Sequence, residues 1–463
     1  MKNFLFAATL LLVFSCTPGE NKQVYKDKKA GIEDRIDDLL SRMTLDEKIL
    51  QMNQWSMGRN TNINNVEERT KGFQPGLGSY IYQSGDPELR NLVQKRNLDS
   101  ARIGIPILFG YDVIHGFRTI FPIPLAQACS WNADLVHHSS EIAAKEAWLS
   151  GIDWTFSPMI DVSRDPRWGR IAECYGEDPY TNAVFCVAAV DGYQGESLAD
   201  SFTIASCLKH YVGYGLSEGG RDYHFTEISY QTLWDTYLVP YKAGIKAGVA
   251  TVMSAFNDIS GTPATAHHYL LTEVLKERWN WDGFVVSDWK AVDQLQAQGV
   301  AADRKEAAYK ALTAGVEMDM TDNIYNEELK GLVDEGKISM DIIDDAVRRI
   351  LRLKFELGLF DQPYAPVINE SERYLLPEYK SVAEQLTEES MVLLKNNEVL
   401  PLNDNIKSVA LFGPIAKNKE DLLGSWWAQG QAEDVISVFE GLEAEFDGSV
   451  KINYAMGCDF EGN

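Results

Sequence analysis

The chain has 463 residues, of which 45% are hydrophobic and 24% are charged, a composition typical of a globular protein. This length is too great for one ordinary core, so we expect a large domain with part or all of a second. With 43 basic and 68 acidic residues the formal net charge is -25, which argues against nucleic acid as a partner because phosphates attract clustered lysine and arginine.

The N-terminus is predicted to direct export. Residues 1–15 contain one early lysine and an apolar run of about a dozen residues, which fits a signal peptide and is too short to span a bilayer. Ser15 directly before Cys16 resembles a bacterial lipobox, which implies cleavage before Cys16 and acylation of its thiol; a simple signal peptide with a chance cysteine is the alternative. Residues 16–31 are polar and would form a tether, so we expect an exported lipoprotein that is periplasmic or anchored at the outer membrane.

The cysteines favour neither a disulfide framework nor a metal site. With Cys16 acylated an odd number remains, and no two cysteines have the C-x-x-C spacing of a structural zinc site. The others are Cys129, Cys174, Cys186, Cys207 and Cys458, and we expect most of these five to be small buried side chains.

Short apolar runs alternate with helix-length segments from residue 76 to residue 320. Segments 139–150 and 304–315 have the rhythm of amphipathic helices. The runs between such segments are continuously apolar, which favours a parallel sheet covered on both faces, and so many units in about 250 residues favour a (β/α)8 barrel over an open sheet. The predicted strands lie within 76–82, 105–112, 152–161, 202–211, 249–257, 283–288 and 315–320.

Polar or ionisable residues stand where these strands should end. In a barrel all such ends open on one face, where active sites lie, whereas a doubly wound sheet collects ligands only at its switch point. The sequence therefore predicts one polar site at the barrel mouth. The residues at the strand ends are Asp112, Asp161, Lys209, His210, Asn257, Asp288 and Asp319.

A second domain is predicted to follow the barrel. A last barrel helix within 338–360 makes 32–360 the barrel domain, and 361–384 is expected to be a linker. Residues 385–463 fit the opening of an α/β sandwich domain, and because they are short for one we expect the chain to stop in mid-domain. The elements expected in this region are a helix at 381–397, a strand at 408–416, a helix at 436–446 and a strand at 450–457.

The stretch GFVVSDW, residues 283–289, places a carboxylate directly after a buried strand. Trp289 offers a flat apolar platform beside Asp288, and a carboxylate next to an aromatic face suits a sugar, whose ring stacks while its hydroxyls bond to acids. The structural alternative is that Asp288 caps the next helix.

Lys209 and His210 add two donor groups at another strand end. A hydroxyl-rich ligand or a carboxylate would satisfy them when they are buried. The alternative for Lys209 is a Schiff-base lysine, which would need an apolar pocket. Asp112, in GYDVIHG, is suited to binding two adjacent hydroxyls.

The loop 162–180 is dense in Arg, Asp, Trp and Gly, which is typical of a long binding loop. Arg164, Arg167 and Arg170 are candidates for bidentate bonds to a diol or carboxylate, with structural salt bridges as the alternative.

Other reaction classes lack their motifs in this sequence. There is no GxxxxGKS phosphate loop, no HExxH or other metal-ligand run and no GxSxG elbow around a serine. Phosphoryl transfer, metal-assisted hydrolysis and serine esterase chemistry are therefore not indicated, and we expect no metal and no cofactor.

Four stretches, GYDVIHG (110–116), RDPRWGRIAECYGEDPY (164–180), KHYVGYGLSEGGRDY (209–223) and GFVVSDW (283–289), occur in the order and spacing of a known family. They resemble glycoside hydrolase family 3, the family of β-glucosidases and β-xylosidases. The resemblance extends from about residue 32 to residue 463, and it implies a barrel followed by an α/β sandwich, with the active site between them.

The resemblance also implies a retaining mechanism, which requires two carboxyl groups about 5 to 5.5 Å apart. Asp288 would be the nucleophile, kept ionised by nearby cations. Phe256 stands where many members have a tyrosine, so a hydrogen bond to the nucleophile is expected to be missing. Asp112, Arg170, Lys209 and His210 would hold the hydroxyls of the terminal sugar, and Met253, Phe256 and Trp289 would shape its pocket.

The second carboxyl group is not assigned. In β-glucosidases of this family it is a glutamate of the second domain, which we expect beyond Asn463. A branch of the family that acts on N-acetylglucosamine uses a histidine on a barrel loop, and His224 lies in roughly that region, although its EGGRDY context resembles the glucosidase branch.

The implied activity is that of an exo-acting β-glucosidase, which releases terminal glucose from β-linked oligosaccharides. β-Xylosidase or arabinosidase specificity stays open, as does a sugar-binding remnant without an acid/base. Contact with a membrane is expected only through the lipid on Cys16.

Overall fold

Residues 23–69 and 74–460 are described by the computed structural model of the protein. The predicted signal peptide and Cys16 lie outside these residues. Part of the predicted tether, 16–31, is folded, because Val24–Lys26 form a 3-10 turn (η1) in which Tyr25 is buried. The Tyr25 carbonyl oxygen accepts a hydrogen bond from Arg35 Nε at 3.0 Å, so this stretch belongs to the fold and is not a free tether.

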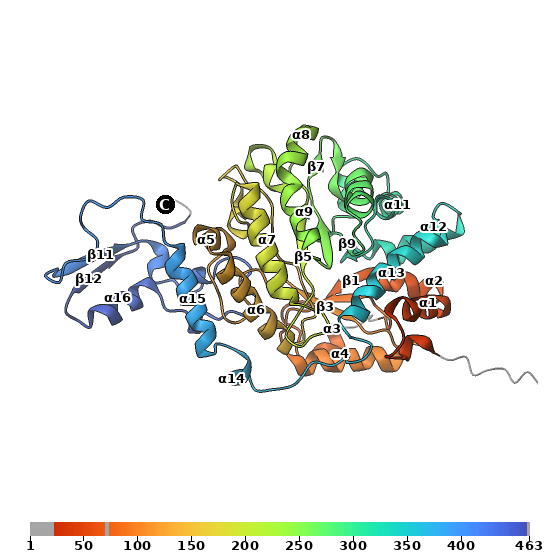
Figure 1. Ribbon diagram of the computed structural model, residues 1–463, viewed down its shortest axis with the longest axis horizontal. Coiled ribbons are helices and arrows are strands. Elements are labelled where there is room, and N and C mark those ends of the chain that lie inside the picture. The colour runs from red at the N-terminus through yellow and green to blue at the C-terminus, as the bar shows by residue number, and fades with distance from the viewer. Residues whose placement is uncertain (1–22, 70–73, 461–463) are drawn as a thin grey trace, which may run out of the picture.

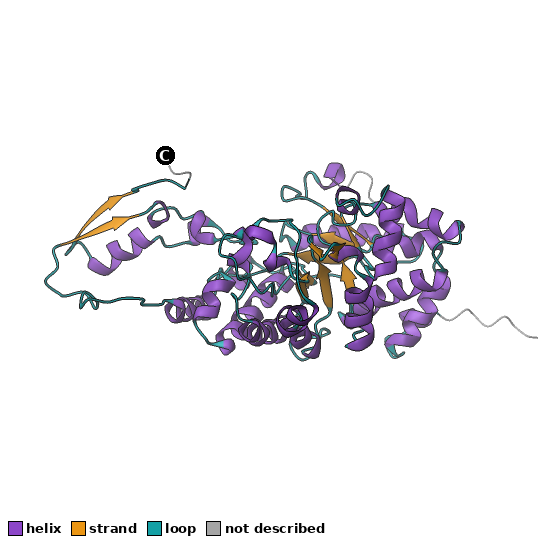
Figure 2. Cartoon of the chain, turned by 90° about the horizontal axis from the view of Figure 1, so that it is seen from above, coloured by secondary structure: helices purple, strands orange, loops and turns teal. Residues whose placement is uncertain are grey.

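Parallel strands form the centre of the molecule (Figure 2). One sheet has five strands in the order β10-β1-β2-β3-β4, and the other has three in the order β5-β6-β9. Every pairing within these two sheets is parallel, as the continuous apolar runs predict. The strands are β1 (Asn53–Ser56), β2 (Ser79–Ile81), β3 (Leu108–Tyr111), β4 (Trp154–Thr155), β5 (Cys207–Tyr211), β6 (Thr251–Ser254), β9 (Phe284–Val286) and β10 (Asp319–Met320).

Isolated bridges connect the edges of the two sheets. Met159, just after β4, pairs with Lys209 of β5, and Val286 of β9 pairs with Met318, just before β10. Both bridges are parallel. Each edge strand of one sheet therefore meets an edge strand of the other. The predicted α/β fold built on parallel strands is confirmed.

Helices surround these strands (Figures 1 and 2). Helix α11 shows how the sequence sets their ends: Asp303 accepts a hydrogen bond from the Glu306 backbone N–H at 2.8 Å, and Gly315 ends the helix at φ 110°. The helices are α1 (Ile32–Arg42), α2 (Leu45–Gln51), α3 (Val66–Arg69), α4 (Pro87–Ser100), α5 (Pro124–Cys129), α6 (Ala133–Leu149), α7 (Pro179–Gln194), α8 (Tyr230–Thr232), α9 (Val239–Lys246), α10 (Gln294–Ala297), α11 (Arg304–Ala314), α12 (Ile324–Asp334) and α13 (Met340–Glu356), with a π-helical segment η7 (Tyr269–Arg278).

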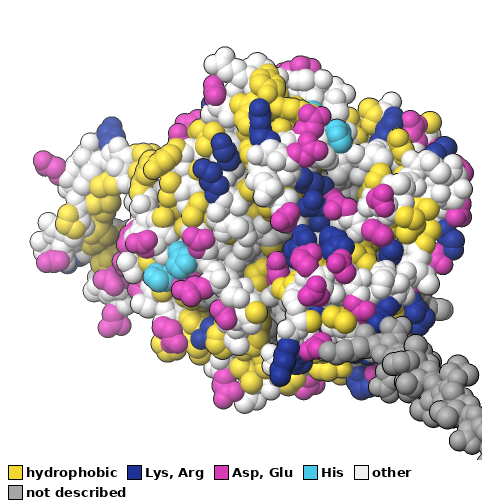
Figure 3. Space-filling model, turned by 45° about the vertical axis from the view of Figure 1, so that its right-hand side comes forward, with side chains coloured by type: hydrophobic (Ala, Val, Ile, Leu, Met, Phe, Trp, Pro, Cys, Tyr) yellow, Lys and Arg dark blue, Asp and Glu magenta, His cyan; other side chains and the backbone are white. Residues whose placement is uncertain are grey.

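The surface mixes charges of both signs. Figure 3 shows basic side chains interspersed with acidic ones on one face of the molecule. Ion pairs join neighbouring charges of opposite sign; Arg348 and Arg352 of α13, for example, both pair with Glu33 of α1. Because the acid neutralises them, these arginines add little to the clustered positive charge that a nucleic-acid partner needs.

The chain beyond α13 first returns to the helices α5 and α6. Helix α14 (Glu370–Arg373) is followed by α15 (Pro377–Ser390), so the predicted linker 361–384 is partly helical. Leu386 of α15 is fully buried with Phe121, which precedes α5, and with Leu135 of α6.

The predicted helix 381–397 is wrong in its second half. It ends at Ser390, and the apolar residues Met391 to Leu394 are exposed and irregular. This run has the composition of a helix, but no other part of the described chain covers it, and helices gain most of their stability from such packing.

The last described segment contains a small parallel pair of strands. β11 (Ser408–Phe412) pairs with β12 (Lys451–Ala455), and α16 (Val438–Phe446) lies between them in sequence, as predicted. Figure 2 shows this pair apart from the central strands. A short antiparallel hairpin, β7 (Asp258–Ile259) and β8 (Thr262–Pro263), follows β6.

Within residues 23–69 and 74–460, no helix combines the length and the apolar character that a membrane crossing requires.

Candidate active site

Asp288 lies just past the end of β9, and its carboxylate is almost fully buried. Oδ1 accepts a hydrogen bond from the backbone N–H of Trp289 at 2.6 Å, whereas Oδ2 has no hydrogen-bond partner among the described residues. The next helix, α10, begins at Gln294 with Asp293 at its N-cap. Asp288 is therefore not a helix cap, and its second oxygen is buried without a hydrogen bond from the described residues.

His210 stands between two buried carboxyl groups. Its ring Nδ1 and its backbone N–H each lie 2.9 Å from Asp161 Oδ2. On the other side of the ring, Nε2 lies 3.3 Å from Asp288 Oδ2. Three residues that the sequence placed at different strand ends are thus in direct contact.

Lys209 points into the same site and pairs with Asp112. The distance from Lys209 Nζ to Asp112 Oδ1 is 2.8 Å. Nζ also lies 5.6 Å from the centroid of the Trp426 ring, so a residue of the C-terminal segment reaches the site. This polar surrounding does not match the apolar pocket that a Schiff-base lysine requires.

An irregularity in β5 helps to explain how the adjacent residues Lys209 and His210 can both point into one site. Successive side chains of a regular strand point to opposite faces. The register between β5 and β6 shifts between Leu208 and Tyr211, and such irregularities re-aim side chains near active sites. Lys209 and His210 lie within this shifted stretch.

Arg170 completes the polar wall of the site. It makes two hydrogen bonds to Glu173, from Nε at 2.8 Å and from Nη2 at 3.0 Å. Its guanidinium group also lies 5.6 Å from the centroid of the Tyr214 ring. Of the three arginines predicted in the loop, Arg170 belongs to this cluster, whereas Arg167 pairs with Asp165 on the surface and Arg164 lies over Tyr237.

Aromatic and apolar side chains form the rest of the site. Met253 of β6 and Phe256 after it are buried, and Trp289 is 44% exposed. The Phe256 ring lies 6.4 Å from that of His210 and 4.8 Å from that of Tyr223, which is itself 60% exposed. Tyr223 ends the stretch 209–223 but was given no role in the sequence analysis, and Trp426 lies outside every motif used there, so both were missed.

Burial dominates the electrostatics of the two carboxyl groups. It raises the pKa of Asp288 to about 6, although Arg170 and Lys209 act in the opposite direction. Burial also raises the pKa of Asp161 to about 7. The expectation that cations keep the pKa of the nucleophile low is thus outweighed, but at neutral pH Asp288 is still mostly ionised.

His210 is neutral in this environment. Burial lowers the pKa of its imidazole well below the usual value, and Arg170 and Lys209 lower it further. A neutral ring has one donor and one acceptor nitrogen, so Nδ1 and Nε2 of His210 have different hydrogen-bonding roles.

Some predicted strand-end residues serve the fold. Asp319 Oδ2 accepts hydrogen bonds from the first backbone N–H groups of α12, at Ile324 and Tyr325. Asn257 donates to Thr226 Oγ1 at 3.1 Å. The His224 ring lies edge-on to the Phe225 ring, with 4.6 Å between their centroids, and its Nε2 lies 3.4 Å from Arg221 Nη1.

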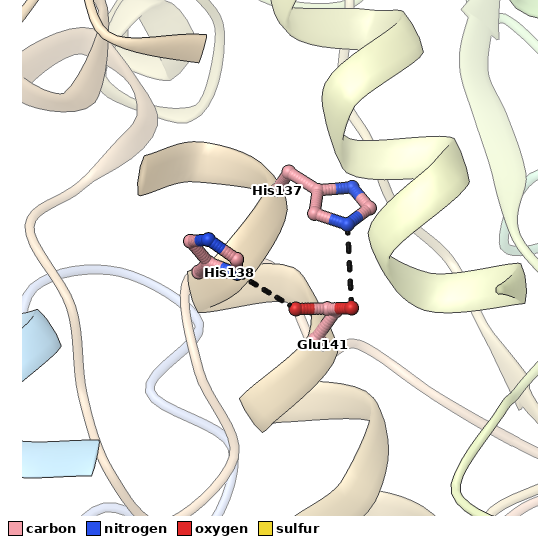
Figure 4. Close-up of side chains that lie close together, drawn as sticks. All are labelled: His137, His138 and Glu141. Atoms are coloured by element: carbon pink, nitrogen blue, oxygen red, sulfur yellow. Dashed lines mark hydrogen bonds and ion pairs between the residues drawn. The ribbon is translucent and has the colours of Figure 1, made fainter. Parts of the chain in front are cut away.

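A separate group of side chains that could bind a metal ion lies on α6. His137 and His138 both face Glu141, at 3.3 Å from Nε2 and 2.8 Å from Nδ1 (Figure 4). In residues 23–69 and 74–460 this is the one set of three His, Cys, Asp or Glu side chains close enough to share a metal ion. The contacts within the set already satisfy its carboxylate, and the group lies on the outer helix layer.

Comparison with known families identifies the chain. The model of the "Glycosyl hydrolase family 3 N terminal domain" matches residues 44–353, and that of the "Glycosyl hydrolase family 3 C-terminal domain" matches residues 391–457. The periplasmic beta-glucosidase of Salmonella typhimurium is 39% identical over 433 residues, which are 92% of this chain and 56% of that protein. A putative beta-xylosidase of Formosa agariphila is 34% identical over 445 residues, 90% of this chain and 59% of that protein.

Solved structures agree with this comparison. A mutant beta-glucosidase from Listeria innocua in complex with laminaribiose is 39% identical and matches with a TM-score of 0.87, over 92% of this chain and 61% of that one. The chain thus spans between 56% and 61% of the length of these three relatives. The family models match well over half of its residues. The chain belongs to glycosyl hydrolase family 3.

Proposed function

We propose that this protein is a retaining exo-β-glucosidase that releases terminal glucose from β-linked oligosaccharides, with Asp288 as its nucleophile. The observation that carries this proposal is the buried, mostly ionised carboxylate of Asp288, whose Oδ2 has no hydrogen-bond partner among the described residues. The relatives named beta-glucosidase support the choice of glucose.

In the first step, the Asp288 carboxylate attacks the anomeric carbon while the bond to the leaving oxygen breaks. A general acid gives that oxygen a proton, and water later releases the sugar from Asp288. Asp112 and Asp161 are engaged by Lys209 and His210. We therefore assign the acid to neither of them and propose a glutamate outside the described residues.

The pocket side chains have separate roles in this proposal. Asp112, Lys209, His210 and Arg170 carry donors and acceptors that match sugar hydroxyls. Met253, Phe256 and Trp289 shape the pocket. The exposed rings of Tyr223 and Trp426 add to it.

We propose that the strands of the two parallel sheets form a (β/α)8 barrel within 32–360. The strand orders and the two edge bridges support this arrangement. The segment 361–384 would connect it to an α/β sandwich domain that begins within 385–463, where the C-terminal family model matches. Because α15 packs on α5 and α6, we place the end of the connection before Pro377.

We propose that the protein is exported and anchored by a lipid on Cys16. The apolar N-terminus supports export, as does the periplasmic location in the name of the Salmonella relative. Metabolic labelling with a fatty acid tests this, with Cys16→Ser as the control that should lose the label. An unlabelled wild-type protein contradicts the anchor.

Hydrolysis of an aryl β-glucoside tests the proposed activity. A dinitrophenyl leaving group needs little acid assistance, so the rate reports on the nucleophile. We expect Asp288→Asn to lose at least about 1,000-fold in rate, because the amide cannot attack the anomeric carbon. Asp282→Asn, an exposed aspartate before β9, is the matched control and should keep wild-type activity.

The same assay separates the alternatives. Faster turnover of the β-xyloside would support xylosidase specificity, which the name of the Formosa relative raises. Binding of glucose without turnover of any activated glycoside would support a sugar-binding protein instead. Equal activity in Asp288→Asn and wild type would remove Asp288 as the nucleophile.

A further inference from the structure

Asp161 lies behind His210, on the side of the ring opposite Asp288. It follows β4, and the bridge between Met159 and Lys209 sets it beside β5. Its side chain has an exposed fraction of 0%, so it cannot contact a sugar in the pocket. Any effect of Asp161 on the reaction must therefore pass through His210.

Both hydrogen bonds that Asp161 accepts come from His210 and fall on one oxygen. The backbone N–H and ring Nδ1 of His210 each lie 2.9 Å from Oδ2. Oδ1 has no partner in the described part of the chain. When Asp161 is ionised, Oδ2 can only accept, so Nδ1 is the protonated nitrogen of the neutral ring.

The opposite nitrogen, Nε2, is consequently bare and faces Asp288. It lies 3.3 Å from Asp288 Oδ2, which accepts no hydrogen bond from the described residues. A proton on Nε2 would donate to this oxygen, lower the pKa of Asp288 and weaken it as a nucleophile. The tautomer of His210 therefore decides whether the Asp288 carboxylate accepts a hydrogen bond from the ring.

The other groups around His210 do not change the Nδ1-protonated tautomer of its ring. Burial lowers the pKa of the imidazole, and the cations Arg170 and Lys209 lower it further, so the ring stays neutral. Tyr241 donates to the His210 carbonyl oxygen at 2.6 Å and does not reach the ring nitrogens. The charged and aromatic groups that surround the ring are Lys209, Arg170, Glu173, Tyr214, Phe256, Asp161 and Asp288.

We propose that Asp161 is a positioning residue that holds His210 in the Nδ1-protonated tautomer, so that His210 does not donate a hydrogen bond to Asp288. The Asp288 carboxylate then attacks without a hydrogen bond from the imidazole to weaken it as a nucleophile. The role in catalysis rests on the proposed function, whereas the tautomer itself does not.

Nitrogen NMR of protein labelled with 15N-histidine tests the tautomer without any reaction. At pH 8 and without sugar, we expect Nδ1 protonated and Nε2 bare, with the signal assigned by its loss in His210→Gln. Asp161→Asn can present its amide oxygen to both N–H groups and should keep this tautomer. Asp161→Ala removes the acceptor and should move the ring toward the Nε2-protonated form.

Two results overturn the proposal in this experiment. One is a wild-type His210 protonated on Nε2, and the other is an unchanged tautomer in Asp161→Ala. If Asp161→Ala does not fold, the wild-type spectrum still decides the question.

The pH dependence of covalent labelling by dinitrophenyl 2-deoxy-2-fluoro-β-glucoside tests the consequence for Asp288. In Asp161→Ala the Nε2–H group should donate to Asp288 and move the acid limb of the labelling rate down by about one pH unit. In Asp161→Asn the limb should stay where it is in the wild type. An unshifted limb in Asp161→Ala contradicts the proposal, whereas an unlabelled wild type contradicts the proposed function and leaves the spectra to judge Asp161.

Discussion

At the residue scale, the site pairs its buried charges with specific partners, but Asp288 Oδ2 and Asp161 Oδ1 accept no hydrogen bond from the described residues. Lys209 pairs with Asp112 at 2.8 Å, and Arg170 forms two bonds to Glu173. Because these cations are already shared with other acids, their attraction does not outweigh the cost of burying Asp288. The result is a carboxylate that is ionised near neutral pH yet poorly satisfied, as a nucleophile should be.

The raised pKa of Asp288 predicts an acid limb in the pH profile. Only the ionised carboxylate attacks, and burial raises its pKa to about 6, so the rate of covalent labelling should rise with pH up to about 6 and level off above it. Labelling reactions that are quenched at timed intervals, at pH values from 4 to 8, measure this limb. A limb near pH 4, the value of an exposed aspartate, would contradict the electrostatic argument.

Strand-end residues were predictable because the ends of parallel strands converge on one face. Asp112, Lys209, His210 and Asp288 follow this rule and lie in one cluster. The rule does not tell a ligand-facing group from one that bonds backbone. Asp319, at another strand end, binds the start of α12 instead.

At the element scale, apolar runs predicted the other central strands, whereas β1, which has no such run, was missed. β9 has the buried core Phe284–Val286 that predicts a strand. β1 begins with Asn53 and Gln54, which are fully buried but polar. Their side chains bond to the Ile49 carbonyl and to Ser79, contacts that no periodicity reveals.

Helix α15 buries Tyr379 and Leu386, and the contact of Leu386 with Phe121 and Leu135 predicts how the helix responds to a cavity there. Leu386→Ala should cost about 2 kcal/mol or more and speed hydrogen exchange of the α15 amides at least about 30-fold, because it empties the contact with Phe121 and Leu135. Leu394→Ala, at a residue 91% exposed, is the matched control and should change nothing. Equal exchange in both variants would show that α15 does not depend on this contact.

At the scale of the whole molecule, the C-terminal segment reaches back over the strand ends. The Ser425 carbonyl oxygen lies 2.6 Å from His115 Nε2, and the Gln429 N–H donates to the Phe117 carbonyl at 2.8 Å. Arg118 adds an ion pair with Asp434 at 2.8 Å. These contacts flank Trp426 and hold it near Lys209, which is why a site predicted from barrel motifs alone was incomplete.

Trp426 should therefore contribute to binding. Trp426→Ala removes the ring beside Lys209 and should weaken the binding of gluconolactone about 3- to 30-fold, the range of a stacking or cation–π contact. Calorimetric titration measures the change, with Trp131→Ala, at a tryptophan 80% exposed, as the control that should bind normally. Unchanged affinity in Trp426→Ala would exclude the segment from the pocket.

The nucleophile itself is tested by locating the covalent intermediate. The wild-type protein is incubated with dinitrophenyl 2-deoxy-2-fluoro-β-glucoside, digested, and its labelled peptide is sequenced by mass spectrometry. The fluorine slows release of the sugar, so the intermediate accumulates. We predict one sugar per chain, attached to Asp288 in the peptide that contains GFVVSDW. A label on any other residue, or no label at all, would contradict Asp288 as the nucleophile of a retaining glycosidase.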